Sequence, residues 1–200
     1  CPALGAMRYS VTTPNCLPLL HGPEGCAFRN KNLWVEVGSF YLMPQWPVIT
    51  TAMSQEDVFF GGEEVLRRAI VSADKYYKPG LIVPINTCAG AIIGDDVEGV
   101  CDSLRGEVNC LLAPVNLPGF LSRNQAVGYE SFLMAIAKHV MKEQKEKIPL
   151  SINYIGESYG SLRMEVPFPT DMEEIDRVLK EWGVNIHCYL PGSSVEKLIE

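Results

Sequence analysis

The chain has 200 residues, of which 47% are hydrophobic and 20% charged, so it can bury a core large enough for one domain, or for one domain and part of a second. Its formal charge of -7, and the lack of any Lys or Arg run interleaved with aromatic residues, argue against nucleic acid or an anionic membrane as a partner. The sequence has neither a signal peptide nor the roughly 18 uninterrupted apolar residues of a membrane span, so we expect a cytoplasmic protein.

The first 147 residues alternate between strand-like and helix-like patterns. Residues 17–20 are apolar and are followed by His21 and a Gly-Pro-x-Gly turn that precedes Cys26. Residues 61–77 and 124–147 have the apolar spacing of helices with one buried face. These faces comprise Val65, Leu66, Ala69 and Ile70 in the first helix and Phe132, Leu133, Ile136 and Val140 in the second. The remaining predicted elements are strands at 47–53, 81–86 and 108–115 and a helix at 94–106.

After residue 147 the pattern begins again, with a strand at 150–157, a helix at 170–183 and a strand at 184–190. Thr170 is the expected N-cap of this helix, and Gly183 is its expected stop. Alternation of this kind predicts a parallel sheet covered by helices. We therefore expect a Rossmann-like α/β domain over residues 1–147, with helices on both faces of its sheet, and the beginning of a second, similar α/β domain over residues 148–200.

Seven cysteines are an odd number for a disulfide framework, and the sequence carries no secretory signal to accompany one. They are Cys1, Cys16, Cys26, Cys88, Cys101, Cys110 and Cys188. No C-x-x-C pair and no H-x-x-x-H pair occurs, so a metal site would have to be assembled from distant segments. Because the chain starts at a cysteine instead of Met and stops in a helix-like stretch, we also expect both ends to be cuts in a longer protein.

Two of these thiols are predicted to lie at the carboxyl ends of strands, where open parallel sheets bind their ligands. Cys26 follows the first apolar stretch, and Cys88 follows the strand at 81–86. The glycines beside them, Gly22, Gly25, Gly90 and Gly94, would let the backbone approach a bulky group without side-chain clashes. An iron-sulfur cluster is one such group, because soft thiolates suit iron. Simple burial of both cysteines as small apolar side chains is the alternative that the spacing leaves open.

Several segments together resemble the component 1 family of nitrogenase, in the family's order and over nearly the whole chain. "CPALGAM" and "PLLHGPEGCAF" resemble its first two cluster-cysteine segments, and "NTCAGAIIGDDVEGV" resembles the third. "TTAMSQEDVFFGGEEVLRRAI", "PGFLSRNQAVGYESF" and "INYIGE" also have counterparts in that family. Several independent motifs at compatible intervals are more specific than any one of them.

The resemblance implies that Cys1, Cys26 and Cys88 are thiolate ligands of an iron-sulfur cluster, a [4Fe-4S] cluster or a larger fused one. Three ligands are one fewer than the four of a lone [4Fe-4S] cluster. In the family a homologous component 1 subunit supplies the remainder, so we expect a homo- or hetero-oligomer with the cluster at its interface. The family also implies a separate ATP-dependent iron-sulfur reductase as electron donor, and this chain has no G-x-x-x-x-G-K-[ST] loop of its own.

The segment around Tyr129 departs from the catalytic nitrogenase subunit. Gln125 and Gly128 match the family pattern, but Tyr129 stands where that subunit has a histidine facing its metal cofactor. A phenol does not exchange protons near neutral pH as an imidazole does, so dinitrogen reduction is not expected.

We predict that Gln125 and Tyr129, with Gly25 and Gly90, are cofactor-binding residues. Three functions are then open: a redox component of an ATP-dependent reductase, a scaffold on which a metal cofactor is assembled, and a metal-free α/β binding module.

The remaining candidates have simpler interpretations. Cys101, Cys110 and Cys188 fall inside predicted helices or strands and are expected to be core residues, whereas Cys16 could approach the cluster. His21 is expected to be a structural hydrogen-bond partner near the first turn. Asp95 and Asp96 could be a magnesium pair, but their place in a first helical turn favours capping and dipole compensation. Glu63 and Glu64 favour the same interpretation.

Overall fold

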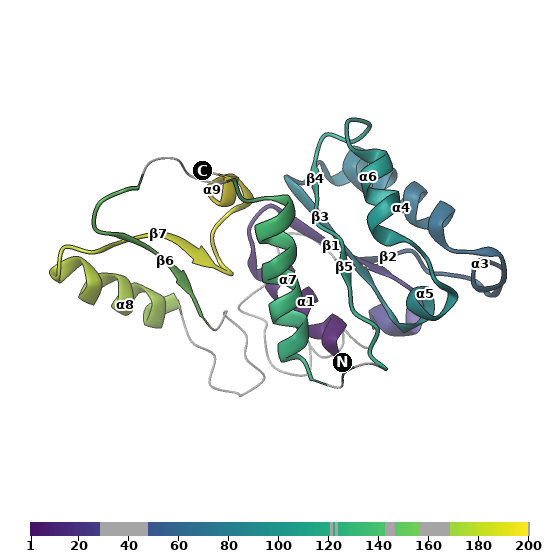
Figure 1. Cartoon of the computed structure of the whole chain (residues 1–200), viewed down its shortest axis with the longest axis horizontal. Helices are drawn as coiled ribbons and strands as arrows, with labels where there is room; N and C mark the ends of the chain where they lie inside the picture. The colour runs from purple at the N-terminus through teal and green to yellow at the C-terminus, as the bar shows by residue number, and fades with distance from the viewer. Residues whose placement is uncertain (29–47, 121, 123, 143–146, 157–168, 200) are drawn as a thin grey trace.

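A computed structural model describes residues 1–28, 48–120, 122, 124–142, 147–156 and 169–199 (Figure 1). Helices and strands alternate through most of these ranges, as the sequence predicts. Their bounds are α1 Pro2–Thr12, β1 Cys16–His21, β2 Ile49–Thr50, α3 Gln55–Phe60, α4 Glu63–Tyr77, β3 Leu81–Asn86, α5 Cys88–Ile93, α6 Val97–Leu104, β4 Leu111–Leu112, β5 Val115–Asn116, α7 Ala126–His139, β6 Ser151–Ile155, α8 Pro169–Glu181, β7 Asn185–Leu190 and α9 Val195–Ile199.

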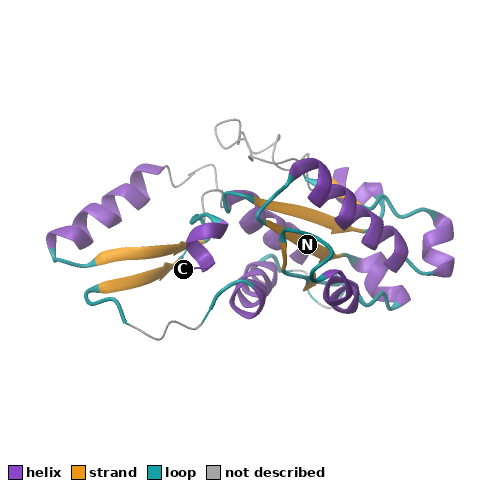
Figure 2. Ribbon diagram, turned by 90° about the horizontal axis from the view of Figure 1, so that it is seen from above, coloured by secondary structure: helices purple, strands orange, loops and turns teal. Residues whose placement is uncertain are grey.

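Every strand pair in the described ranges is parallel. The larger sheet has the order β2-β1-β3-β4, and β5 continues the pairing with β3. Figure 2 draws the strands of both sheets in orange. β1 and β3 pair along their whole lengths, from Cys16 opposite Leu81 to His21 opposite Asn86. A smaller sheet contains β6 and β7. The predicted parallel α/β fold is therefore confirmed.

Helices pack on both faces of the larger sheet because successive strand residues point to opposite sides. In β1, Leu17 and Leu19 pack with the apolar side of α4 and α6, which presents Leu66, Ile70, Val100 and Leu104. On the other face, Leu20 packs with residues of α1 and α7 that include Met7, Phe132 and Ile136. The faces predicted for α4 and α7 are thus the buried ones, although Val65, Ala69 and Leu133 are only partly buried.

The core around α1 and α7 extends to the last described residues. Leu190, Val195 and Leu198 belong to the same buried cluster as Met7 and Phe132. In addition, the Val195 N–H donates a hydrogen bond of 3.2 Å to the Pro14 carbonyl. Residues 188–199 therefore pack against the first predicted domain, and the division at residue 147 stays a prediction.

Several predicted boundaries are wrong in detail. The single strand expected at 108–115 is replaced by two short strands, β4 and β5. Of the strand expected at 47–53, residue 47 lies outside the described residues, and in the rest only the two residues of β2 form a strand. The helix expected at 124–147 ends at His139, and α8 begins one residue before the expected N-cap Thr170. α1 and α3 were not predicted. Gly183, with φ of +76°, follows α8 as expected.

Each helix in the described ranges is too short or too polar to span a membrane.

α1 and α7 approach each other closely because each presents a glycine at the crossing. A Cβ atom at Gly128 would lie 1.9 Å from the Pro2 carbonyl oxygen, and one at Gly5 would lie 2.2 Å from the Gln125 carbonyl oxygen. Contacts this short with backbone atoms cannot be relieved by moving a flexible side chain. Gly128, the glycine before Tyr129 that matches the family pattern, is therefore explained by the close packing of α7 on α1.

We predict that Gly128→Ala lowers the free energy of unfolding by about 2 kcal/mol or more, because the added methyl would force α1 and α7 apart. Urea unfolding followed by circular dichroism measures the change. Gly25→Ala is the matched control, because its Cβ would meet nothing within 4 Å. Equal unfolding midpoints for the two variants would contradict the close crossing.

Candidate metal centre at the carboxyl edge of the sheet

The register of β1 and β3 brings two of the predicted ligand segments to one edge of the sheet. β1 ends at His21 and β3 ends at the opposite residue, Asn86. Cys88 is the first residue of α5, and Cys26 lies in the helical turn of residues 24–28. The expected transition from strand to helix at Cys88 is confirmed.

Thr87 connects these two segments. Its N–H and its hydroxyl both donate to the His21 carbonyl, at 3.1 and 2.9 Å, and its hydroxyl occupies the space left by the missing side chain of Gly22. Burial raises the pKa of the Cys26 thiol, a hydrogen bond with Thr87 lowers it, and the nearby Cys88 raises it. The net shift is upward. Cys26 and Cys88 are thus close enough for charge on one sulfur to disfavour charge on the other.

Cys1 reaches the same edge from α1, where it is the N-cap residue. The point where a Cβ of Gly119 would lie is 3.1 Å from Cys88 Sγ and 3.8 Å from Cys1 Sγ. The two sulfur atoms therefore border a space that any other residue at position 119 would fill. The Gly119 N–H donates to Cys88 Sγ at 3.2 Å, a contact that stabilises negative charge on sulfur.

The structure thus brings Cys1, Cys26 and Cys88 into one neighbourhood, half-buried or exposed. Among the described residues, no three His, Cys, Asp or Glu side chains are grouped as ligands of a single metal ion. A cluster makes a different demand, because each of its irons takes its own thiolate. The chemistry of this donor set, three thiols with an N–H directed at one sulfur, fits an iron-sulfur cluster, and ligation stays a prediction.

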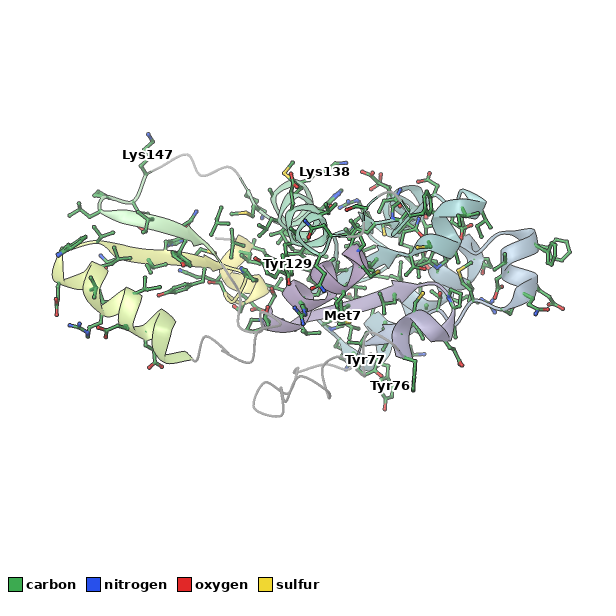
Figure 3. All side chains as sticks on the ribbon, turned by 90° about the horizontal axis from the view of Figure 1, so that it is seen from below. Met7, Tyr76, Tyr77, Tyr129, Lys138 and Lys147 are labelled. Carbon is green, nitrogen blue, oxygen red and sulfur yellow. The ribbon has the colours of Figure 1, made fainter. Side chains whose placement is uncertain are left out.

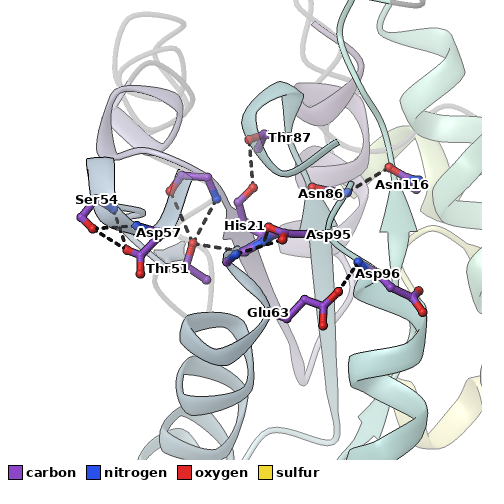
Figure 4. A network of polar contacts seen from close by, with 12 residues as sticks. His21, Thr51, Ser54, Asp57, Glu63, Asn86, Thr87, Asp95, Asp96 and Asn116 are labelled. Carbon is purple, nitrogen blue, oxygen red and sulfur yellow. Dashed lines mark hydrogen bonds and ion pairs between the residues drawn. The ribbon is translucent and has the colours of Figure 1, made fainter. Parts of the chain in front are cut away.

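A buried polar network lies beneath these loops (Figure 4). His21, fully buried, has Nε2 2.8 Å from Asp95 Oδ2 and Nδ1 3.3 Å from the Thr51 hydroxyl. Asp95 Oδ1 also accepts from the Gly62 N–H at 2.9 Å. The network connects the end of β1, the beginning of α4 and the loop between α5 and α6. His21 is therefore a structural partner, as predicted.

The prediction that Asp95 caps a helix is wrong, because its carboxylate lies in this network instead. Asp96 is the N-cap of α6 and accepts from the Gly99 N–H at 2.9 Å, so its predicted capping role is confirmed. Glu63 accepts from the Asp96 N–H at 3.0 Å and joins α4 to α6. The sequence alone does not indicate that Asp95 joins the network of His21 whereas the adjacent Asp96 caps α6.

The two glycines predicted to bind a cofactor differ in their surroundings. A Cβ at Gly90 would lie 2.3 Å from Asn86 Oδ1 and 2.8 Å from a carbon of the His21 ring, so this glycine lets α5 pack on the protein itself. Gly25 has open space where its side chain would be. Asn86 Oδ1 is the one buried side-chain oxygen or nitrogen in the described ranges without a hydrogen-bond partner. A role in cofactor binding stays a prediction for both glycines.

Gln125 and Tyr129 lie at the beginning of α7, against α1. The Arg8 Nη1 donates to Gln125 Oε1 and to the Tyr129 hydroxyl, both at 3.3 Å. The Tyr129 ring stacks on Tyr9 with 4.5 Å between centroids. Sequence reasoning missed Arg8, although a single basic residue in the apolar stretch "PALGAMRYSV" could have signalled it.

The other four cysteines are buried. Burial raises the pKa of Cys16, and it raises the pKa of both Cys101 and Cys110 to about 12. Burial also raises the pKa of Cys188. Such thiols resist the deprotonation that ligation needs. The expectation of core packing is confirmed for the latter three, and Cys16, inside β1, is buried as well.

The fold defines an α/β protein whose parallel sheet carries thiol-bearing loops at its carboxyl edge. Comparison with known proteins identifies the family. All 200 residues match the model of the nitrogenase component 1 type oxidoreductases, and the chain belongs to this family.

Named relatives and a solved structure agree with this assignment. The chain is 30% identical over 194 residues to the nitrogenase iron-molybdenum cofactor biosynthesis protein NifE of Methanococcus maripaludis, covering 95% of this chain and 38% of that protein. It is 32% identical over 182 residues to the nitrogenase molybdenum-iron protein alpha chain of Methanosarcina barkeri, covering 87% and 32%. The structure titled "Nitrogenase Cp1 at pH 6.5" matches with a TM-score of 0.76 and 25% identity, over 98% of this chain and 38% of that one. The chain thus spans well under half the length of these relatives.

We predict that Asp95→Ala lowers the free energy of unfolding by about 3 kcal/mol or more, because it leaves His21 and the Gly62 N–H buried without their partner. The neighbouring Asp96→Ala removes only a helix cap and should cost about 1 kcal/mol. Chemical denaturation of the two variants beside the unchanged protein gives both values. If Asp96→Ala proved the more damaging change, the buried network would not have the importance assigned to it.

Proposed function

We propose that this chain is the cluster-binding part of a nitrogenase-like component 1 protein. In this proposal Cys1, Cys26 and Cys88 hold an iron-sulfur cluster that accepts electrons from a separate ATP-dependent iron-sulfur reductase. The observation that carries the proposal is the convergence of three thiols from distant segments, two of them around Gly119. Bound there, the cluster would supply one-electron redox chemistry.

The chain's own residues have defined tasks in this proposal. Thr87 keeps the segments of Cys26 and Cys88 together through the His21 carbonyl. The Gly119 N–H stabilises charge on the Cys88 sulfur, a contact that influences the reduction potential of a bound cluster. The buried pair of His21 and Asp95 keeps the floor of the site rigid. A second, homologous subunit completes the ligand set, so we propose an oligomer with the cluster at its interface.

A scaffold for assembly of a metal cofactor is the second candidate function. It is favoured by relatives named as iron-molybdenum cofactor biosynthesis proteins, including one from a Nostoc species that is 37% identical over 162 residues, or 78% of this chain and 33% of that protein. Tyr129 also supports it, because its hydroxyl is held by Arg8 and its ring by Tyr9. A fixed phenol suits binding better than proton delivery. In a scaffold the second metal group is cargo that leaves for an acceptor protein.

We predict that the protein purified anaerobically contains stoichiometric iron and acid-labile sulfide, and that Cys26→Ala and Cys88→Ala lose most of both. Cys110→Ala is the matched control, because this cysteine is buried near β4 and its loss should cost only about 1 kcal/mol of packing. Iron and sulfide analysis with an EPR spectrum of the dithionite-reduced protein provides the measurement. Cys88→Ala should also weaken the oligomer if the cluster bridges subunits.

An iron-free protein that stays folded and oligomeric would contradict the proposal and favour the metal-free binding module. Equal iron contents for Cys88→Ala and Cys110→Ala would remove Cys88 from the ligand set. Transfer of a metal group to an acceptor protein, with the Cys26-dependent iron retained, would select the scaffold. Electron delivery to a small substrate would select the reductase.

A further inference from the structure

A charged cluster joins α6 to α7 at one edge of the larger sheet. β4 and β5 form this edge, because within the described ranges they pair with β3 alone. α6 packs on one face of the sheet and α7 on the other, and both helices contact β5. Arg105 directly follows α6, and its Nη2 lies 2.9 Å from Nδ1 of His139, the last residue of α7. This contact connects the two helix layers across the edge.

The contact requires a neutral imidazole. A guanidinium only donates hydrogen bonds, so Nδ1 of His139 must be the unprotonated nitrogen that accepts from Arg105. The ring proton is then on Nε2, which lies 4.0 Å from Glu98 Oε1. A second proton on Nδ1 would place a donor against a donor and a positive charge beside the guanidinium. Arg105 would then have to leave His139, and it would keep Asp102, which accepts from its Nε at 2.8 Å.

Burial and two cations oppose protonation of this ring. The His139 side chain is 8% exposed, and burial is the main cause that lowers its pKa below the ordinary value of 6.5. Lys138 and Arg105 lower the pKa further, whereas Glu98 and Asp102 raise it. Glu98 is half exposed and shared with Lys138, which points outward from α7 in Figure 3. The net shift of the His139 pKa is therefore downward.

We propose that the contact between Arg105 and His139 is an acid-sensitive clamp, which holds α6 and α7 together over β4 and β5 and opens when His139 is protonated. The inference goes beyond the proposed function and depends on neither a metal nor a partner. Because β5 leads directly to Gly119, opening also loosens the segment whose N–H reaches Cys88 Sγ.

The pH dependence of the clamp has a defined direction. Because the closed form lowers the pKa of His139, the clamp has its full strength above the ordinary value of 6.5. It weakens as the pH falls through that value toward the lower pKa of the closed form, and below both values this residue causes no further change. Each pKa unit of lowering increases the opening equilibrium constant about tenfold once His139 is protonated.

The test is hydrogen exchange of the full chain, measured by mass spectrometry from about pH 8 to about pH 5 and corrected for the intrinsic effect of pH on amide exchange. Peptides over residues 104–116 should lose protection several-fold as the pH falls below 6.5, while peptides of β1 and β3 keep theirs. His139→Gln should abolish this loss, because its amide oxygen can accept from Arg105 and does not titrate. His187→Gln, in β7, is the matched control and should leave the loss unchanged.

A second measurement does not depend on how His139→Gln folds. The titration of isotope-labelled histidines by NMR should give His139 a lower midpoint in the folded chain than in urea, and Arg105→Met should raise the folded midpoint. The proposal is overturned if residues 104–116 keep their protection below pH 6.5, or if His139→Gln loses it as the unchanged protein does. An Arg105→Met variant with an unchanged His139 midpoint would also overturn it. Iron content enters none of these outcomes, so they are separate from the fate of the cluster proposal.

Discussion

The parallel register of β1 and β3 is the constraint on which the site depends. Because His21 is opposite Asn86, both strands end at the same level, and the segments of Cys26 and Cys88 must leave the sheet side by side. β5 pairs with the end of β3, so the chain that follows it carries Gly119 to the same edge. α1 adds Cys1 from the face that it shares with α7. A shift of one residue would exchange the two buried faces of β1, so that Leu17 and Leu19 would face α1 and α7 instead of α4 and α6, and it would separate these loops.

Close backbone contacts make this edge rigid. Gly22 and Gly90 leave room for Thr87 and His21, and Gly62 brings its N–H to Asp95. Glycine-rich segments that suggest a bulky ligand in the sequence therefore serve partly to pack protein against protein. The same principle applies at Gly128, where α1 and α7 touch. In the proposed cluster site, these contacts would fix the segments of the three cysteines before a metal binds, which would reduce the entropy lost on binding.

Much of the fold could be predicted from the sequence, and the site only in outline. The continuous apolar run of β3 and the amphipathic spacing of α4 and α7 are strong local signals. α1 was missed because it is buried nearly all round, so it has no polar face to give it a helical period. Asp95 was misassigned because its partners, His21 and Gly62, come from other segments. For the same reason no local pattern reveals the contacts of Arg8, because Gln125 and Tyr129 are distant in the sequence and lie beside it only in the folded chain.

The central claim is that three thiols at the carboxyl edge of the sheet bind one metal cluster. Anaerobic alkylation followed by mass spectrometry, before and after iron is removed with a chelator, tests it most directly. The account predicts that Cys1, Cys26 and Cys88 are protected together while iron is bound and become labelled together when it is removed. Cys16, buried in β1, should stay protected in both states. Rapid labelling of any of the three while the iron content is unchanged would contradict the account.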